Sequence, residues 1–125
     1  MTNEFPSHWP ACCPPHDAEA TVGLYFRVGK NNPPIREDFQ SQAELNRAFG
    51  ADPCKREGLS MLRNLTDAKH LIRVNQRLGS VIYQGELNTT HGRSKLTSSQ
   101  TSPTHTTWWP VVDVDRAAPF KVVNG

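Results

Sequence analysis

Aromatic, β-branched and other apolar residues cluster in short segments bounded by turn residues, which predicts a set of β-strands. Residues 21–28 form the first, because their apolar run ends at a glycine and a Pro-rich turn follows. In residues 80–87, Val81, Tyr83 and Leu87 share one face of the expected strand, and the other face carries polar residues at its end. Three shorter segments are also predicted as strands: residues 58–62, 108–114 and 120–123.

Two helices are predicted between these strands. Ser41 followed by Glu44 matches a capping box, and apolar residues then recur at helical spacing up to Gly50. A second helix is predicted over residues 66–78, with Gly79 as its terminating residue. One apolar stripe of this helix is expected to be buried, and it comprises Leu71, Val74 and Leu78.

The order of these elements predicts an α+β fold, built from a small twisted mixed or antiparallel sheet with two short helices. At 125 residues the chain fits a single domain, which we place at residues 21–125. Residues 1–20 are expected to form an irregular arm that Phe5 and Trp9 pin across the domain. The Ser- and Thr-rich residues 88–107 are expected to be one long polar loop.

The charge and hydropathy of the chain limit its partners. The net charge is +2, with both signs interspersed, so the basic stripe expected of a nucleic-acid-binding protein is absent. No apolar segment is long enough to span a membrane, and the first residues do not resemble a signal peptide. We therefore expect a cytoplasmic protein without membrane contact, and the charge pattern does not support a nucleic-acid partner.

The chain has three cysteines, Cys12, Cys13 and Cys54. An odd count argues against a disulfide framework, so all three are predicted to be reduced and free of metal. Two alternatives stay open. A zinc site could use the cysteines with His16, although adjacent cysteines do not match the usual ligand spacing. Cys54 could also be a nucleophile, because its two basic neighbours would favour the thiolate.

A His-Thr-Thr-Trp-Trp-Pro segment follows the polar loop. Paired tryptophans usually belong to a core, but His105 and Trp108 could equally form the wall of a ligand pocket. The two interpretations are compatible if Trp108 and Trp109 face opposite ways.

Three further segments carry the most specific functional signal: Leu24-Tyr25-Phe26-Arg27, Gly58-Leu59-Ser60 and Gln84-Gly85-Glu86. Their combination resembles the arginine-serine-glutamate ADP-ribosyltransferases. The resemblance implies that Arg27 holds a phosphate of NAD, Ser60 braces the nicotinamide ribose, Glu86 stabilises the oxocarbenium-like centre and Gln84 orients the acceptor. Such a carboxylate would stabilise the positive charge that develops on the ribose as the nicotinamide bond breaks.

Two functions therefore remain open. The first is an ADP-ribosyltransferase-like, NAD-glycohydrolase or nucleotide-binding domain, with a nucleotide-like ligand in a cleft near Arg27, Ser60 and Glu86. The second is a non-catalytic module that binds a protein partner through the Trp-rich segment, for example a small regulator or a phage or defence-associated protein. The first function requires Glu86 and Arg27 to share one pocket.

Overall fold

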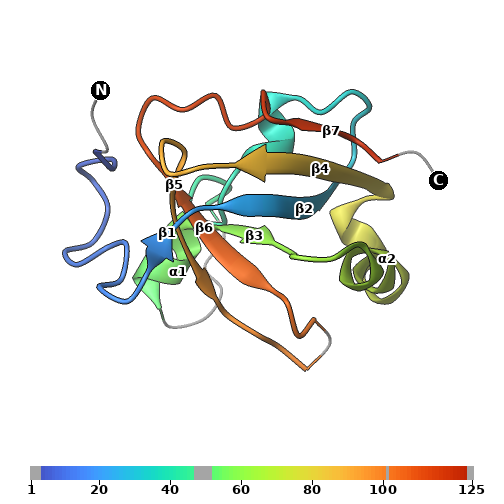
Figure 1. Cartoon of the computed structure of the whole chain (residues 1–125), viewed down its shortest axis with the longest axis horizontal. Helices are drawn as coiled ribbons and strands as arrows, with labels where there is room; N and C mark the ends of the chain where they lie inside the picture. The colour runs from blue at the N-terminus through green and yellow to red at the C-terminus, as the bar shows by residue number, and fades with distance from the viewer. Residues whose placement is uncertain (1–3, 47–51, 101, 124–125) are drawn as a thin grey trace.

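The computed structural model describes residues 4–46, 52–100 and 102–123, and these residues adopt an α+β fold (Figure 1). The strands form two sheets, with orders β1-β5-β6-β3 and β2-β4-β7, and all of their pairings are antiparallel. The strands are β1 (Glu19–Ala20), β2 (Gly23–Gly29), β3 (Leu59–Met61), β4 (Val81–Leu87), β5 (Gly92–Leu96), β6 (Thr106–Pro110) and β7 (Phe120–Val122). The helices are α1 (Pro53–Glu57) and α2 (Leu65–Val74), with 3₁₀ turns η1 (Arg36–Phe39) and η2 (Gln76–Leu78).

One β-bridge joins the two sheets among the described residues. The backbone groups of Phe26 in β2 and of Leu62, just after β3, exchange two hydrogen bonds of 2.8 Å each. β5 and β6 run steeply across the direction of β2 and β4 (Figure 1). The backbone pairing between the two sheets is therefore limited to these two residues in the described part of the chain, rather than forming a full ladder.

The strands predicted near residues 21–28, 58–62, 80–87 and 120–123 are confirmed as β2, β3, β4 and β7. The prediction of a single loop over residues 88–107 is wrong, because this segment contains β5 and the start of β6. In β5 the positions that face the interior are Gly92 and Ser94, and the Ser94 hydroxyl lies 3.1 Å from the Tyr25 hydroxyl. A strand whose inward residues are this small lacks the hydrophobic alternation that would identify it.

The two tryptophans of β6 are completely buried on opposite faces of their strand. Trp108 packs with Phe39, Tyr83 and Phe120 in the main core between the sheets. Trp109 packs against Trp9 of the N-terminal arm. The alternation of side chains along a strand thus places one indole in each of two cores.

The capping box at Ser41 forms, but it does not begin the predicted helix. The Ser41 amide donates to Glu44 Oε1 over 2.8 Å, and the Glu44 amide donates to Ser41 Oγ over 3.1 Å. Residues 42–46 nevertheless form only turns, and residues 47–50 of the predicted helix lie outside the described residues. Helix α1 begins later in the chain, at Pro53, and Asp52 caps it.

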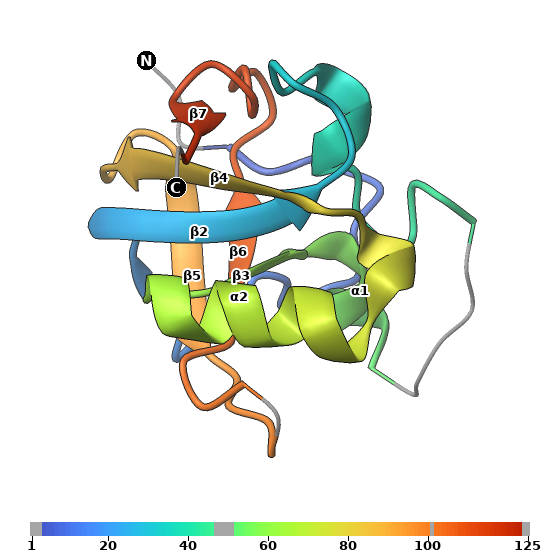
Figure 2. The same cartoon turned by 90° about the vertical axis from the view of Figure 1, so that its right-hand side faces the viewer.

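Helix α2 confirms the second predicted helix, although it ends at Val74 and a separate 3₁₀ turn follows. Asn64 caps the first turn of α2, and the helix lies along the sheet that contains β2 (Figure 2). Ala68 is fully buried against Phe26, whereas Val74 and Leu78 are 52% and 36% exposed. The prediction of a buried stripe is therefore wrong for Val74 and Leu78, and Leu71 is only partly buried. Leu78 lies in η2, outside the helix that the stripe assumed.

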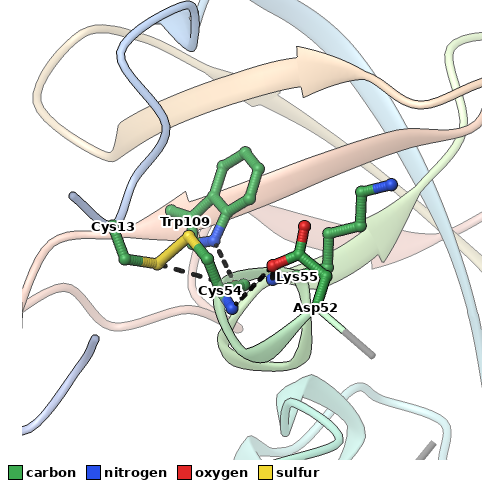
Figure 3. The surroundings of a disulfide bond; sticks show 5 residues. All are labelled: Cys13, Asp52, Cys54, Lys55 and Trp109. Atoms are coloured by element: carbon green, nitrogen blue, oxygen red, sulfur yellow. Dashed lines mark hydrogen bonds between the residues drawn. A yellow bond between two sulfur atoms is a disulfide. The ribbon is translucent and has the colours of Figure 1, made fainter. Parts of the chain in front are cut away.

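The prediction of three reduced cysteines is also wrong. Cys13 of the arm and Cys54 of α1 form a disulfide, and Cys12 is a free, exposed cysteine (Figure 3). The odd count misled the sequence argument, because folding brings together two cysteines that are 41 positions apart and leaves the neighbour of one unpaired. Beside the bridge, the Trp109 indole donates to the Cys54 carbonyl over 2.9 Å.

A polar pocket where two strands separate

The sheet opens beside the bridge between β2 and β3. In a continuing antiparallel ladder, the next pair to exchange backbone hydrogen bonds would be Val28 and Ser60. Instead, the Ser60 carbonyl accepts a hydrogen bond from Nη1 of the Arg27 side chain over 2.8 Å. Backbone groups two residues apart in a strand point the same way, so the N–H and C=O of Val28, like those of the bridged Phe26, point away from β4. Among the described residues, no group hydrogen-bonds these two groups or the Ser60 N–H.

Arg63 holds the strands apart on the other side of the bridge. Its Nε donates to the Leu24 carbonyl over 3.0 Å and its Nη2 to the Val22 carbonyl over 3.1 Å. The guanidinium also stacks on the Tyr25 ring, 4.1 Å from the ring centroid. Arginine side chains therefore replace the ladder on both sides of the bridge, and the opening is built into the fold.

A cavity of about 200 Å³ occupies the opening. Ser60 and His105, both predicted as ligand-binding residues, line it together with Arg27. The sequence did not identify the other lining residues, which are Val28, Gln40, Gln42, Lys55, Gly58, Leu59, Leu62, Leu71, Leu78 and Thr107. The leucines of α2 and η2 give the cavity an apolar end, and the amide, hydroxyl and cationic groups give it a polar end.

Arg27 carries a positive charge to this cavity, and no carboxylate among the described residues forms an ion pair with it. Besides Ser60, its guanidinium donates to the carbonyl of Asp38 over 2.7 Å and to that of Gln40 over 3.4 Å. Burial, with the charge of Arg116 nearby, lowers the pKa of Arg27 to about 10, so the group stays protonated at neutral pH. Backbone carbonyls position this cation but do not neutralise it.

The Asp38 carboxylate is directed to a neighbouring turn. Its oxygens accept from the backbone N–H groups of Lys30 and Ile35 and from the Asn31 amide, at 3.0 to 3.1 Å. Burial acts to raise the pKa of Asp38, but these donors outweigh it and hold the pKa below its ordinary value. Asp38 is therefore ionised and fully used in the turn.

His105 is held at the polar end by Thr97. Its Nδ1 lies 2.8 Å from the Thr97 hydroxyl, which is in turn 2.9 Å from the Thr107 hydroxyl. Burial lowers the pKa of His105, and Lys55 contributes to the same direction. The ring is therefore neutral at pH 7, and its Nε2 has no hydrogen bond to any described residue.

The cavity favours an anion or a strong hydrogen-bond acceptor. None of the described residues that line it is Asp or Glu, whereas Arg27 and Lys55 are cations. The Val28 and Ser60 N–H groups face the same opening and have no partner there. The Gln42 Oε1 is buried without a partner among the described residues, so a ligand donor could complete its hydrogen bonding.

Gln84 and Glu86 do not belong to this cavity. In the β2–β4 ladder Arg27 stands opposite Tyr83, whereas Glu86 stands opposite Leu24, so the Arg27 and Glu86 side chains project from opposite faces. Gln84 has the same parity as Glu86. Glu86 is exposed, and the prediction that it shares a pocket with Arg27 is wrong.

Trp108 is also absent from the cavity, because its ring is completely buried in the main core. Trp109 is equally buried, so neither indole is available as a contact surface for a partner protein. In the described part of the chain, no three His, Cys, Asp or Glu side chains are placed to hold a metal ion. Within the same residues, no helix is long and apolar enough to cross a membrane.

Comparisons of the chain with protein-family models, with curated proteins and with solved structures find no match.

Proposed function

We propose that this domain binds a small anionic, nucleotide-like molecule in the cavity between β2 and β3. The observation that carries the proposal is the interrupted ladder, which directs two unpaired N–H groups and an arginine that forms no ion pair with a described carboxylate at one opening. Preorganised N–H groups beside a cation are the usual means by which proteins hold phosphate and carboxylate oxygens.

The size and chemistry of the cavity define how such a ligand would lie. Pockets for drug-sized ligands have volumes of about 300 to 1,000 Å³, so the 200 Å³ here would enclose only part of a nucleotide. We place an anionic group near the Ser60 N–H and Arg27, and the less polar part toward Leu71 and Leu78. The Val28 N–H and C=O offer a donor beside an acceptor, which a nucleobase or carboxamide edge can complement.

The proposal is binding rather than group transfer. Transfer of ADP-ribose from NAD would need a carboxylate beside the ribose, and Glu86 lies on the other face of its sheet. NAD remains a candidate ligand as a nucleotide, with part of it outside the cavity. On this proposal the domain binds NAD or a smaller nucleotide without consuming it.

A matched pair of substitutions tests the proposal by isothermal titration with AMP, NAD and inorganic phosphate. Lys55→Gln and Glu86→Gln each remove one exposed charge, the first at the cavity and the second away from it. We expect Lys55→Gln to weaken AMP binding about threefold to fivefold, as loss of one solvent-screened charge contact should. Glu86→Gln should leave the AMP affinity unchanged.

Two results would contradict the proposal. One is the absence of saturable binding for all three probes, and the other is an equal loss of affinity in both variants. A wild type that hydrolyses NAD, with turnover lost in Glu86→Gln, would instead support the transferase function implied by the resemblance.

A further inference from the structure

The Cys13–Cys54 disulfide ties the N-terminal arm to one wall of the cavity. Cys54 is the second residue of α1, and the next residue, Lys55, lines the cavity, as does Gly58 at the end of the helix. Figure 3 shows the Lys55 side chain extending from α1 away from the disulfide. The helix therefore presents its disulfide to the arm and its lysine to the cavity.

Helix α1 depends on tertiary contacts for its position. It has five residues, far fewer than an isolated helix needs for stability in water. Asp52 caps it locally, and contacts that help to fix it to the domain include the disulfide, the Trp109 indole on the Cys54 carbonyl and the Ala43 amide on the Arg56 carbonyl. The disulfide is the one covalent contact among these.

The arm also has noncovalent attachments to the domain: β1 pairs with β5, and the Glu4 carbonyl accepts from the Val112 amide over 2.8 Å. Asp17 pairs with Lys95 across 2.7 Å on the surface, and the Ala18 carbonyl accepts from Arg93. Trp9 covers the buried Trp109, whose indole in turn anchors α1. Loss of the disulfide therefore weakens α1 twice, directly at Cys54 and indirectly by loosening the cover over Trp109.

We propose that the Cys13–Cys54 disulfide is a redox switch that controls ligand binding in this cavity, an inference that rests on the proposed function. A cellular dithiol reduces the bridge and is itself oxidised to a disulfide. The S–S bond breaks, and each sulfur receives one electron and one proton, giving two thiols. The arm is then joined to α1 only by noncovalent contacts, the wall that carries Lys55 loosens, and the oxidised form binds the ligand more tightly than the reduced form.

The experiment compares Cys12→Ser with Cys12→Ser/Cys13→Ser. Cys12 is exposed and outside the bridge, so the first variant keeps the disulfide and prevents exchange with the free thiol. The second variant cannot form the bridge. AMP affinity is measured by titration, hydrogen exchange is followed in peptides covering residues 52–60, and thiols are counted by alkylation without reductant.

We expect no alkylated thiol in Cys12→Ser, and an AMP affinity about fivefold or more lower in the double variant, within the usual range of coupling between sites. Exchange over residues 52–60 should be faster in the double variant. Two reactive thiols in Cys12→Ser, or an unchanged AMP affinity in the double variant, would overturn the switch.

Failure of the proposed function would be recognised separately. If AMP does not bind even to the oxidised protein, the proposed function fails, and hydrogen exchange alone then decides whether the bridge controls the wall. Faster exchange over residues 52–60 in the double variant would support that control, and equal exchange in the two variants would refute it.

Discussion

Removal of the Cys13–Cys54 disulfide should lower the free energy of unfolding by several kcal/mol. The two cysteines are 41 positions apart, so the bridge closes a large loop in the unfolded chain. In the chain-entropy treatment, a loop of this length restricts the unfolded state by about 4 kcal/mol at 25 °C. With an unfolding entropy of about 2.1 cal/mol/K per residue over 125 residues, this is a decrease in Tm of about 15 °C.

Urea denaturation of Cys12→Ser and Cys12→Ser/Cys13→Ser measures this difference. The slope of free energy against urea should be larger in the double variant, because its unfolded chain is less compact. Cys12→Ser should match the wild type within about 0.5 kcal/mol, because Cys12 is exposed and outside the bridge. A difference below about 1 kcal/mol between the two variants would refute the reasoning, since it would mean that the bridge is absent or that the unfolded arm is already constrained.

Two further predictions concern α2 and the polar end of the cavity. Val74→Ser should change the free energy of unfolding by less than about 0.5 kcal/mol, because Val74 is exposed. Ala68→Leu should lower it by about 1 to 3 kcal/mol, because the larger side chain overpacks a fully buried site. Urea denaturation that gives the reverse order would mean that the assigned buried face of the helix is wrong. Burial lowers the pKa of His105, so the imidazole takes up a proton more readily in the unfolded chain than in the folded protein. The stability that the neutral, buried His105 contributes is therefore complete above the unfolded pKa of about 6.5 and decreases as the pH falls through the lower folded pKa. His105→Gln should therefore lose less stability than the wild type between pH 7 and pH 5 in urea denaturation, and parallel losses would contradict this assignment.

The fold could be predicted wherever large apolar residues set the period. The alternation from Val81 to Leu87 identified β4 and the face that it buries, and the apolar stripe identified α2. β5 could not be found in the same way, because Gly92 and Ser94 fill its inward positions. The sequence also does not encode the break after Val74 as a clear stop signal, so the helix was predicted four residues too long.

The candidate site required information that a single sequence does not contain. Arg27 and Ser60 were assigned through the resemblance to ADP-ribosyltransferases and His105 through its place beside the paired tryptophans, and all three line one cavity. Glu86 was assigned to the same site, but its face relative to Arg27 depends on the register between β2 and β4, and a slip of one residue would reverse it. The cavity itself arises from backbone groups left unpaired at Val28 and Ser60, which no side-chain pattern reveals.

The most direct test of the central claim is a titration of ¹⁵N-labelled protein with AMP, followed through the backbone amide signals of Val28 and Ser60. These two N–H groups have no partner among the described residues and face the proposed anion site, so both signals should shift saturably and with one common dissociation constant. The backbone amide signal of Glu86 should not shift, because the Glu86 side chain lies on the other face of the sheet. Saturable shifts that spare Val28 and Ser60, or no saturable shift anywhere, would contradict the claim that the opening between β2 and β3 is the ligand site.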